Sequence, residues 1–327
     1  MKRFVRACAT ALTLTLVMSS SVAAADFREE PLSVAIPVGT LSGTLVIPSG
    51  NGPFTVALIV AGSGPTDRNG NNPMGVRSDT YEKLADGLAE HGIATLRYDK
   101  RMIGASTVHQ EEKDLRFDDY VDDALALLGV LEKDPRFDRV AIIGHSEGSL
   151  IGMLAAQRDP HVAAFVSLEG AGRDLATVLD EQVRANPVNP ESVIQEVVHY
   201  DALLRAGKTI PDPDPSLAAL FRPSVQPYLI SEYKYDPAKE IGKLTIPVLI
   251  VHGTTDMQVA GADAEALAAG DPKARVAIID GMNHVLVDAP ADREANLATY
   301  SQPGLPLAAT LVSTIATFLT TAGRSVR

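Results

Sequence analysis

VAIIGHSEG at residues 140–148 is the most informative stretch of this 327-residue chain. Its four apolar residues predict a buried strand, its Gly-x-Ser-x-Gly pentapeptide predicts a sharp turn, and the small and apolar residues at 149–156 predict a helix. A serine between a strand and a helix is typical of a nucleophile elbow, in which the hydroxyl stands clear of the sheet. Gly144 and Gly148 suit this turn because its backbone segments pass closely. Ser146 is therefore the predicted nucleophile.

Strands and helices alternate along the chain on both sides of this stretch. The predicted strands lie at 33–36, 41–47, 56–60, 93–98, 140–144, 163–168, 247–252 and 275–279, and the predicted helices lie at 80–91, 117–131, 148–157, 262–269 and 306–321. Continuous apolar runs such as 56–60 are typical of strands buried on both faces. We therefore predict an α/β fold with a mostly parallel sheet flanked by helices, in which residues 26–172 and 241–327 form one core.

Residues 173–240 interrupt this alternation. They contain helical stretches at 178–184 and 192–206, and the proline-rich run 210–215 separates these from a further segment. An insertion between two strands of such a sheet lies over the carboxyl ends of the strands, where α/β proteins form their sites. We interpret the insertion as a helical cap that sets substrate size. The alternative is an excursion that packs on the core without touching substrate.

The first 25 residues have the three-part layout of a secretory signal peptide. Residues 1–6 are basic, residues 7–18 are apolar, and Ala23-Ala24-Ala25 supplies an A-x-A cleavage site. The apolar run is shorter than the ~20 residues that span a bilayer, which disfavours the alternative of an uncleaved anchor. We expect cleavage after Ala25 and a secreted or periplasmic protein with no membrane contact after cleavage.

Charge and cysteine content disfavour several classes of partner and bond. The formal net charge is −12 at pH 7, and loss of the basic residues 1–6 would make the chain more acidic still. An acidic chain disfavours nucleic acids and anionic membranes as partners. The one cysteine, Cys8, lies in the predicted signal peptide, so the mature chain would contain no disulfide. The sequence leaves the oligomeric state open.

The residues after Ser146 contain the partners that a serine nucleophile needs. A base must remove the hydroxyl proton and an acid must orient that base, and in the elbow fold they follow in the order serine, acid, histidine. Asp256 comes just after a predicted strand and is favoured over Asp263, which lies inside the next predicted helix. His284 is the only one of seven histidines beyond Asp256. The predicted catalytic residues are thus Ser146, Asp256 and His284, and His145 is expected to point away from the serine.

The tetrahedral intermediate of acyl transfer needs amide donors for its oxyanion. The first is predicted to be the backbone N–H of Glu147, the residue after the nucleophile. The second is predicted to be the N–H of Ser63, with Gly64 as the neighbouring possibility, in the glycine-rich loop after the strand at 56–60. Gly62 and Gly64 are predicted to bind substrate because glycine lets the backbone approach a ligand.

We predict no metal and no cofactor. Residues 67–72 superficially resemble a calcium loop, but Asn72 stands where that loop needs glycine and Ser78 where it needs glutamate. Histidine and cysteine show no zinc-site spacing. Residues 62–64 lack the spacing of a dinucleotide or phosphate-binding loop.

Several further segments together resemble the α/β-hydrolase superfamily, and within it the bacterial EstD-like carboxylesterases, a group that overlaps with serine-aminopeptidase-like and dienelactone-hydrolase-like groups. The resembling segments are GSGPTDRNG at 62–70, RYDKR at 97–101, the elbow, PSVQPY at 223–228, HGTTD at 252–256 and GMNH at 281–284. The resemblance implies an α/β-hydrolase fold, the same three catalytic residues and activity on short-chain carboxylic esters. It also implies a glycine where this chain has Met102.

Three functions remain open at this point. The leading hypothesis is a secreted serine carboxylesterase that acts on a small-molecule ester through an acyl-enzyme. The second is a serine peptidase of the prolyl or aminopeptidase type, which would need a subsite for a charged terminus, built from acids such as Glu169, Asp174 or those of the cap. The third is a non-catalytic binding protein on a hydrolase scaffold, which the presence of all three predicted catalytic residues disfavours.

Overall fold

The computed structural model describes residues 27–322, so the predicted signal peptide lies outside the described residues. The strands are β1 (Phe27–Ile36), β2 (Gly39–Pro48), β3 (Phe54–Val60), β4 (Ile93–Tyr98), β5 (Thr107–Val108), β6 (Phe137–His145), β7 (Val162–Leu168), β8 (Val248–Gly253) and β9 (Arg275–Ile279). They form one sheet in the order β1-β2-β4-β3-β6-β7-β8-β9, with β5 paired to β2. Pairings that involve β2 are antiparallel and all others are parallel. The prediction of a mostly parallel sheet is confirmed.

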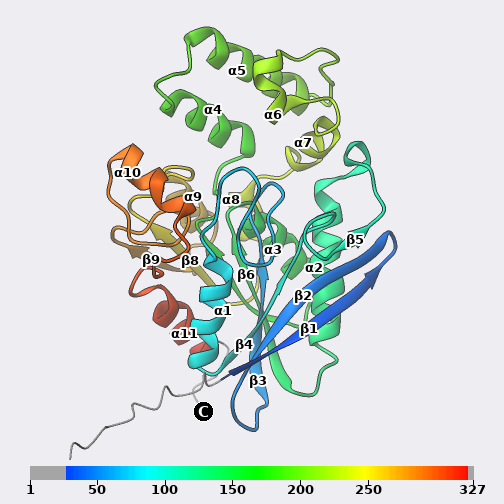
Figure 1. Cartoon of the computed structure of the whole chain (residues 1–327), viewed down its shortest axis with the longest axis vertical. Helices are drawn as coiled ribbons and strands as arrows, with labels where there is room; N and C mark the ends of the chain where they lie inside the picture. The colour runs from blue at the N-terminus through cyan, green and yellow to red at the C-terminus, as the bar shows by residue number, and fades with distance from the viewer. Residues whose placement is uncertain (1–26, 323–327) are drawn as a thin grey trace, which may run out of the picture.

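Helices cover both faces of this sheet (Figure 1). They are α1 (Thr80–Glu90), α2 (Phe117–Leu131), α3 (Glu147–Arg158), α4 (Leu175–Ala185), α5 (Glu191–Arg205), α6 (Ala218–Phe221), α7 (Gln226–Glu232), α8 (Pro237–Ile241), α9 (Gly261–Gly270), α10 (Arg293–Ala298) and α11 (Leu311–Thr321). The last predicted helix was placed too early, since α11 begins at Leu311. The sequence reading also missed α10, a short helix that Asp292 begins by accepting a hydrogen bond from the amide of Ala295.

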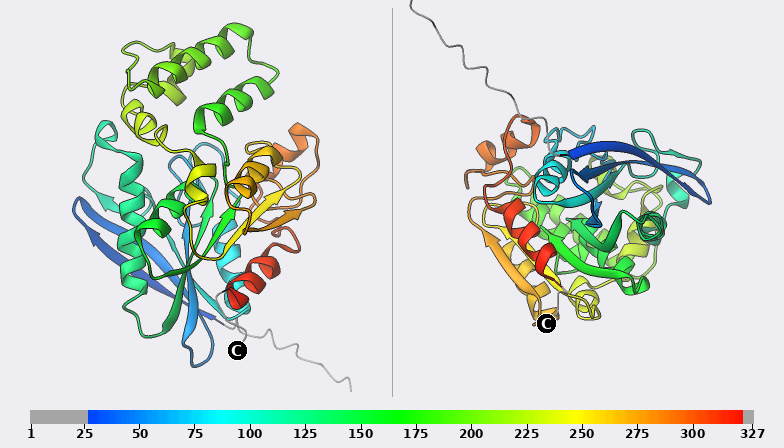
Figure 2. Two further views of the ribbon diagram at one scale, coloured as in Figure 1. Left: turned by 180° about the vertical axis from the view of Figure 1, so that it is seen from behind. Right: turned by 90° about the horizontal axis from the view of Figure 1, so that it is seen from below.

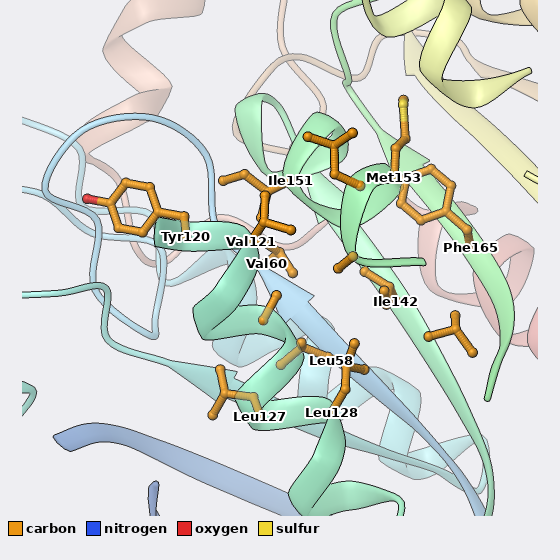
Figure 3. Close-up of a cluster of buried hydrophobic side chains, with 14 of the residues drawn as sticks. Leu58, Val60, Tyr120, Val121, Leu127, Leu128, Ile142, Ile151, Met153 and Phe165 are labelled. Carbon is orange, nitrogen blue, oxygen red and sulfur yellow. The ribbon is translucent and has the colours of Figure 1, made fainter. Parts of the chain in front are cut away.

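Alternation along the central strands creates two hydrophobic layers. Val56, Leu58 and Val60 of β3 face the layer formed with α2 and α3, whereas Ala57 and Ile59 face the layer formed with α1 and α11. Figure 3 shows the first layer, in which side chains of α2 and α3 meet those of β3 and β6. A strand buried on both faces must be apolar at successive positions, which explains why the run at 56–60 is continuous.

The turn between β6 and α3 has the geometry expected of the elbow. Ser146 adopts φ 55° and ψ −126°, a conformation that costs non-glycine residues free energy and persists only where the surroundings enforce it. Gly148 is required here, because a Cβ atom on it would lie 2.3 Å from the carbonyl oxygen of Val60. The close contact of α3 with β3 therefore depends on a residue without a side chain.

Helices α4 to α7 lie together beyond the carboxyl ends of the parallel strands (Figures 1 and 2). They have their own hydrophobic cluster, which includes Val197, Leu204 and Phe221. We call residues 173–240 the cap, and its boundaries stay a prediction. Over residues 27–322, no helix combines the length and apolar character needed to cross a membrane.

Candidate active site

Five neighbouring parallel strands end at the same edge of the sheet, and a polar residue follows each one. Ser63 lies beyond β3, Ser146 directly after β6, Glu169 directly after β7, Asp256 beyond β8 and His284 beyond β9. Residues that are up to 221 positions apart in sequence are thereby brought to one edge, where α/β proteins form their sites.

A cavity of about 110 Å³ lies at this edge. Ser146, His284, Ser63 and Gly62 all line it. The rest of its wall comes mainly from the loop between β3 and α1 and from the start of α1. The loop contributes Thr66, Asn72, Val76 and Ser78, the helix contributes Thr80 and Tyr81, and Gln258 and Val285 complete the wall. Gly64, which was predicted to bind substrate, is not among the described residues that line the cavity. No described residue of the insertion 173–240 lines it either. The predicted nucleophile, base and oxyanion loop thus share one small space.

The predicted acid and base are hydrogen-bonded to each other. His284 Nδ1 lies 2.7 Å from Asp256 Oδ2, and both side chains are buried. Asp256 Oδ1 accepts the backbone N–H groups of Gln258 and Val259, at 2.7 and 3.0 Å. Burial acts to raise the pKa of Asp256, but the charge of His284 and these hydrogen bonds outweigh it and lower the pKa to about 2. Asp256 is therefore ionised at neutral pH and holds the Nδ1–H proton of His284, which leaves Nε2 free.

His145 takes part in a hydrogen-bonded chain and is not free to act as a base. The Tyr81 hydroxyl accepts from the Gly62 amide at 3.1 Å and donates to His145 Nδ1 at 2.8 Å, and His145 Nε2 donates to the His284 carbonyl at 2.9 Å. The carbonyl can only accept, which fixes the tautomer. Burial, with a smaller effect of the His284 charge, lowers the pKa of His145 to about 3. Neutral His145 thus links the oxyanion loop to the backbone of the predicted base.

The two predicted oxyanion donors lie on either side of Ser146. Glu147 is the first residue of α3, where backbone N–H groups have no partner within the helix. Gly62 approaches the nucleophile so closely that a Cβ atom on it would lie 3.0 Å from Ser146 Cβ, which brings the Ser63 peptide beside the serine. The amide of Gly62 is already bound to Tyr81, so the next amide of the loop is the available donor.

Asp263, the competing acid in the sequence reading, is committed elsewhere. It is fully buried near the start of α9 and accepts hydrogen bonds from the backbone amides of Gly172 and Arg173, both at 3.1 Å. The Arg173 guanidinium adds a contact of 2.7 Å to Asp263 and a second ion pair to Glu181 of α4. Asp263 therefore fixes the first residue of the cap to the core.

A second acid–histidine pair, missed in the sequence reading, lies beside the first. Glu169 is fully buried, and its Oε2 lies 2.9 Å from His252 Nδ1 without the geometry of a hydrogen bond. Burial and then the negative charge of Asp256 raise the pKa of Glu169 well above its usual value. The position of Glu169 directly after a buried strand is the feature of the sequence that could have identified it. That position does not indicate that His252 lies beside it.

Met102, where the resemblance implied glycine, adopts φ 63°. Glycine takes this left-handed conformation without strain and methionine does not. The Met102 side chain is 42% exposed, so the local strain is not offset by burial. Nothing else in the structure explains methionine at this position.

Two side-chain groups among the described residues have the residue types of a metal site. Glu132, Asp159 and His161 form one, in which the histidine is exposed. Glu169, His252 and Asp256 form the other, but Asp256 already accepts three hydrogen bonds.

Comparison with known proteins points consistently to hydrolases. A family model described as "Serine aminopeptidase, S33" matches residues 73–186, which include Ser146 but neither Asp256 nor His284. Esterase EstD of Thermotoga maritima is 29% identical over 263 residues. The match covers 77% of this chain, and the chain spans only 59% of the length of that relative.

Solved structures share the fold across nearly the whole chain. Est1E from Butyrivibrio proteoclasticus has a TM-score of 0.57 at 19% identity, with 89% of this chain and 98% of that chain covered. An esterase from Pyrococcus furiosus has a TM-score of 0.58 at 14% identity, with 90% of this chain and 91% of that chain covered. At such low identity these similarities establish the fold alone.

Proposed function

We propose that this chain, which has the α/β-hydrolase fold, is a serine carboxylesterase that cleaves short-chain esters through an acyl-enzyme. The observation that carries the proposal is the shared cavity. Ser146 and His284 line it together, and Asp256 holds the far side of the imidazole at 2.7 Å. We infer that Asp256 orients His284 as the base for Ser146, because activation of a serine hydroxyl requires an oriented imidazole on the same side of the site.

The proposed reaction proceeds in two halves. Ser146 Oγ attacks the ester carbonyl carbon while His284 Nε2 takes the hydroxyl proton, and the N–H groups of Ser63 and Glu147 donate to the resulting oxyanion. The intermediate collapses as His284 protonates the departing alcohol, which leaves an acyl group on Ser146. A water then attacks the acyl carbon, with His284 again as base, and the carboxylic acid departs.

The walls of the cavity favour esters over peptides with a free amino terminus. Among the described residues that line the cavity, none is acidic. The acids nominated for an amino-terminal subsite have other partners: Glu169 lies buried beside His252, and Asp174 begins α4 and pairs with Arg205. A volume of about 110 Å³ suits a short acyl group. The aminopeptidase alternative rests on the description of the matching family model.

The test is a comparison of p-nitrophenyl esters of increasing acyl length with aminoacyl p-nitroanilides, using wild type and Ser146→Ala. We expect the highest kcat/KM on the shortest esters and the loss of at least ~10⁴-fold in the variant. Faster turnover of the anilides would favour the peptidase. A fluorophosphonate probe should label wild type and not Ser146→Ala, and equal labelling of both would exclude Ser146 as the nucleophile.

The N-terminal sequence supports a further part of the proposal, which is export. Residues 1–25 have the layout of a cleavable signal peptide. Mass spectrometry of the exported protein should show a mature chain that begins at Asp26. An intact N-terminus in that spectrum would exclude cleavage.

A further inference from the structure

Lys100 is a buried cation that the proposed reaction does not use. It lies in the loop after β4, is 2% exposed, and stands 4.2 Å over the ring of Tyr120. Its ammonium group lies 3.0 Å from the carbonyl oxygen of Gly62 and 3.2 Å from Glu147 Oε2. Burying a lysine is costly unless its charge is paired and hydrogen-bonded, so these two contacts define its environment.

Each of these two contacts of Lys100 is made to a group next to one of the two proposed oxyanion donors. The carbonyl of Gly62 and the N–H of Ser63 belong to the same planar peptide unit and point in opposite directions. A cation that holds the carbonyl on one side therefore fixes the direction of the N–H on the other. Glu147 supplies the second donor from its own backbone, and its carboxylate is held by the same ammonium group.

Tyr228 of α7 connects the cap to Glu147, which is one of the two groups that contact Lys100. The Tyr228 hydroxyl donates to Glu147 Oε1 at 2.8 Å, so one carboxylate oxygen of Glu147 is held by the core and the other by the cap. Tyr228 is 8% exposed. The cap thus touches the nucleophile elbow although none of its residues lines the cavity within the described chain.

The pKa values of Lys100 and Glu232 reflect the charges that surround them. Burial acts to lower the pKa of Lys100, but the neighbouring carboxylate of Glu147 outweighs it and the pKa is raised. Glu232, also of α7, lies close to both groups, and burial followed by the charge of Glu147 raises its pKa well above the usual value.

We propose that Lys100, Glu147 and Tyr228 form a positioning network that sets the directions of the two oxyanion donors and couples them to the seating of the cap. Lys100 and Tyr228 are positioning residues, because neither lines the cavity. The inference rests on the proposed esterase function, since it assigns the network to the transition state of that reaction. It predicts that weakening the network lowers kcat more than it raises KM.

Tyr228→Phe is the mildest test, and Tyr235→Phe is its matched control. Tyr235 also belongs to the cap and donates to a carboxylate, Asp118 Oδ1, at 2.8 Å, but none of its hydrogen bonds is to Gly62, Ser63 or Glu147. We expect Tyr228→Phe to lower kcat on p-nitrophenyl butyrate roughly tenfold with KM within about twofold, since small misplacements of catalytic groups are costly. Tyr235→Phe should leave kcat and KM unchanged.

A second readout reports on the oxyanion itself. A short-chain alkyl trifluoromethyl ketone forms a tetrahedral adduct with the serine, so its inhibition constant should rise in parallel with the loss in kcat for Tyr228→Phe and not for Tyr235→Phe. Lys100→Met should lower kcat by roughly 100-fold for the same reason. If Lys100→Met does not fold by circular dichroism, Tyr228→Phe still decides the question.

The outcomes separate the inference from the function on which it rests. A wild-type protein that hydrolyses the ester, together with a Tyr228→Phe variant that matches Tyr235→Phe in kcat and in inhibitor affinity, overturns the positioning network. A Tyr228→Phe variant with raised KM and unchanged kcat also overturns it. A wild-type protein without ester turnover or fluorophosphonate labelling instead overturns the proposed function.

Discussion

Two buried acid–histidine pairs lie side by side at the ends of β7, β8 and β9, and they differ in hydrogen bonding and in the direction in which the carboxyl pKa is shifted. Asp256 and His284 are joined by a hydrogen bond of 2.7 Å, whereas Glu169 and His252 approach to 2.9 Å without one. The pKa of Asp256 is lowered to about 2 and that of Glu169 is raised. Both carboxyl groups are fully buried, so burial alone does not separate them.

The two carboxyl groups differ in pKa because they differ in the hydrogen-bond donors that contact them. Asp256 accepts two backbone amides and one imidazole N–H, which stabilise its charge. Glu169 receives no such set of donors: burial, the negative charge of Asp256 and a hydrogen bond to the Asp256 side chain raise its pKa, and only the backbone amide of Gly253 acts to lower it. A carboxyl group in that position keeps its proton. The first pair is thus suited to orient a base, and the second is a neutral neighbour.

The largest expected effect comes from Asp256→Asn. The amide cannot hold the imidazole in the required tautomer, so kcat on p-nitrophenyl butyrate should fall by about 10⁴-fold. The double variant Asp256→Asn/Glu169→Gln tests whether the second acid substitutes for the first, and we expect no further loss. If Asp256→Asn alone keeps kcat within tenfold of wild type, the result would show that Asp256 does not orient the base and that the other acid, Glu169, has that role.

His252→Gln should affect stability and not catalysis. The side chain is 4% exposed, and replacing it disturbs a buried polar contact, so the free energy of unfolding should fall by about 1–3 kcal/mol. The kcat should stay within about threefold of wild type. Urea denaturation and ester kinetics on the same preparations separate the two effects, and a kcat loss that approaches that of Asp256→Asn would contradict the assignment.

The smallest expected effect is a change in the pH dependence of stability in Glu169→Gln. A raised carboxyl pKa means that the native state holds a proton that the unfolded chain releases near pH 4.5, so this group makes stability fall as pH rises above that value. Glutamine has no such proton. The variant should gain about 1 kcal/mol or more relative to wild type between pH 5 and pH 8.

The exposed Glu294→Gln serves as the control for this measurement and should leave the pH dependence unchanged. Part of the wild-type slope should persist in Glu169→Gln, because burial also raises the pKa of Asp201 to about 7. Urea titrations at both pH values provide the data. Parallel curves for Glu169→Gln and wild type would refute a protonated Glu169.

Local patterns were sufficient to predict eight of the nine strands in the described residues and the strand–turn–helix around Ser146, but not the two-residue strand β5. The bounds of α2 and β9 also follow the sequence pattern, since each is a simple run with clear ends. The signal is strong in these places because buried strands must be apolar and an elbow must have small residues. The roles of Ser146, Asp256 and His284 remain a prediction, although the structure places them at one edge of the sheet.

Contacts between distant segments could not be predicted in this way. Tyr81 and His145 are 64 residues apart, and Tyr228 and Glu147 are 81 apart, so no local periodicity relates them. Sequence order also gave no reason for Asp263 to bind the first residue of the cap. These bonds depend on how the loops cross above the sheet, which is a property of the tertiary fold.

The attachment of Asp263 to the first residue of the cap has a consequence for the exchange of the cap between related proteins. Asp263 and Arg173 secure the entry of the inserted segment, and Tyr228 and Tyr235 secure its exit, while the cluster around Val197 lies between them. The segment between these anchors also contacts the core, through Gln182 and the Gln258 carbonyl at 2.7 Å and through Arg222 and Glu112. Transplanting residues 175–225 from a relative, with the anchors and these contacts retained, tests whether the inserted segment influences which esters are cleaved.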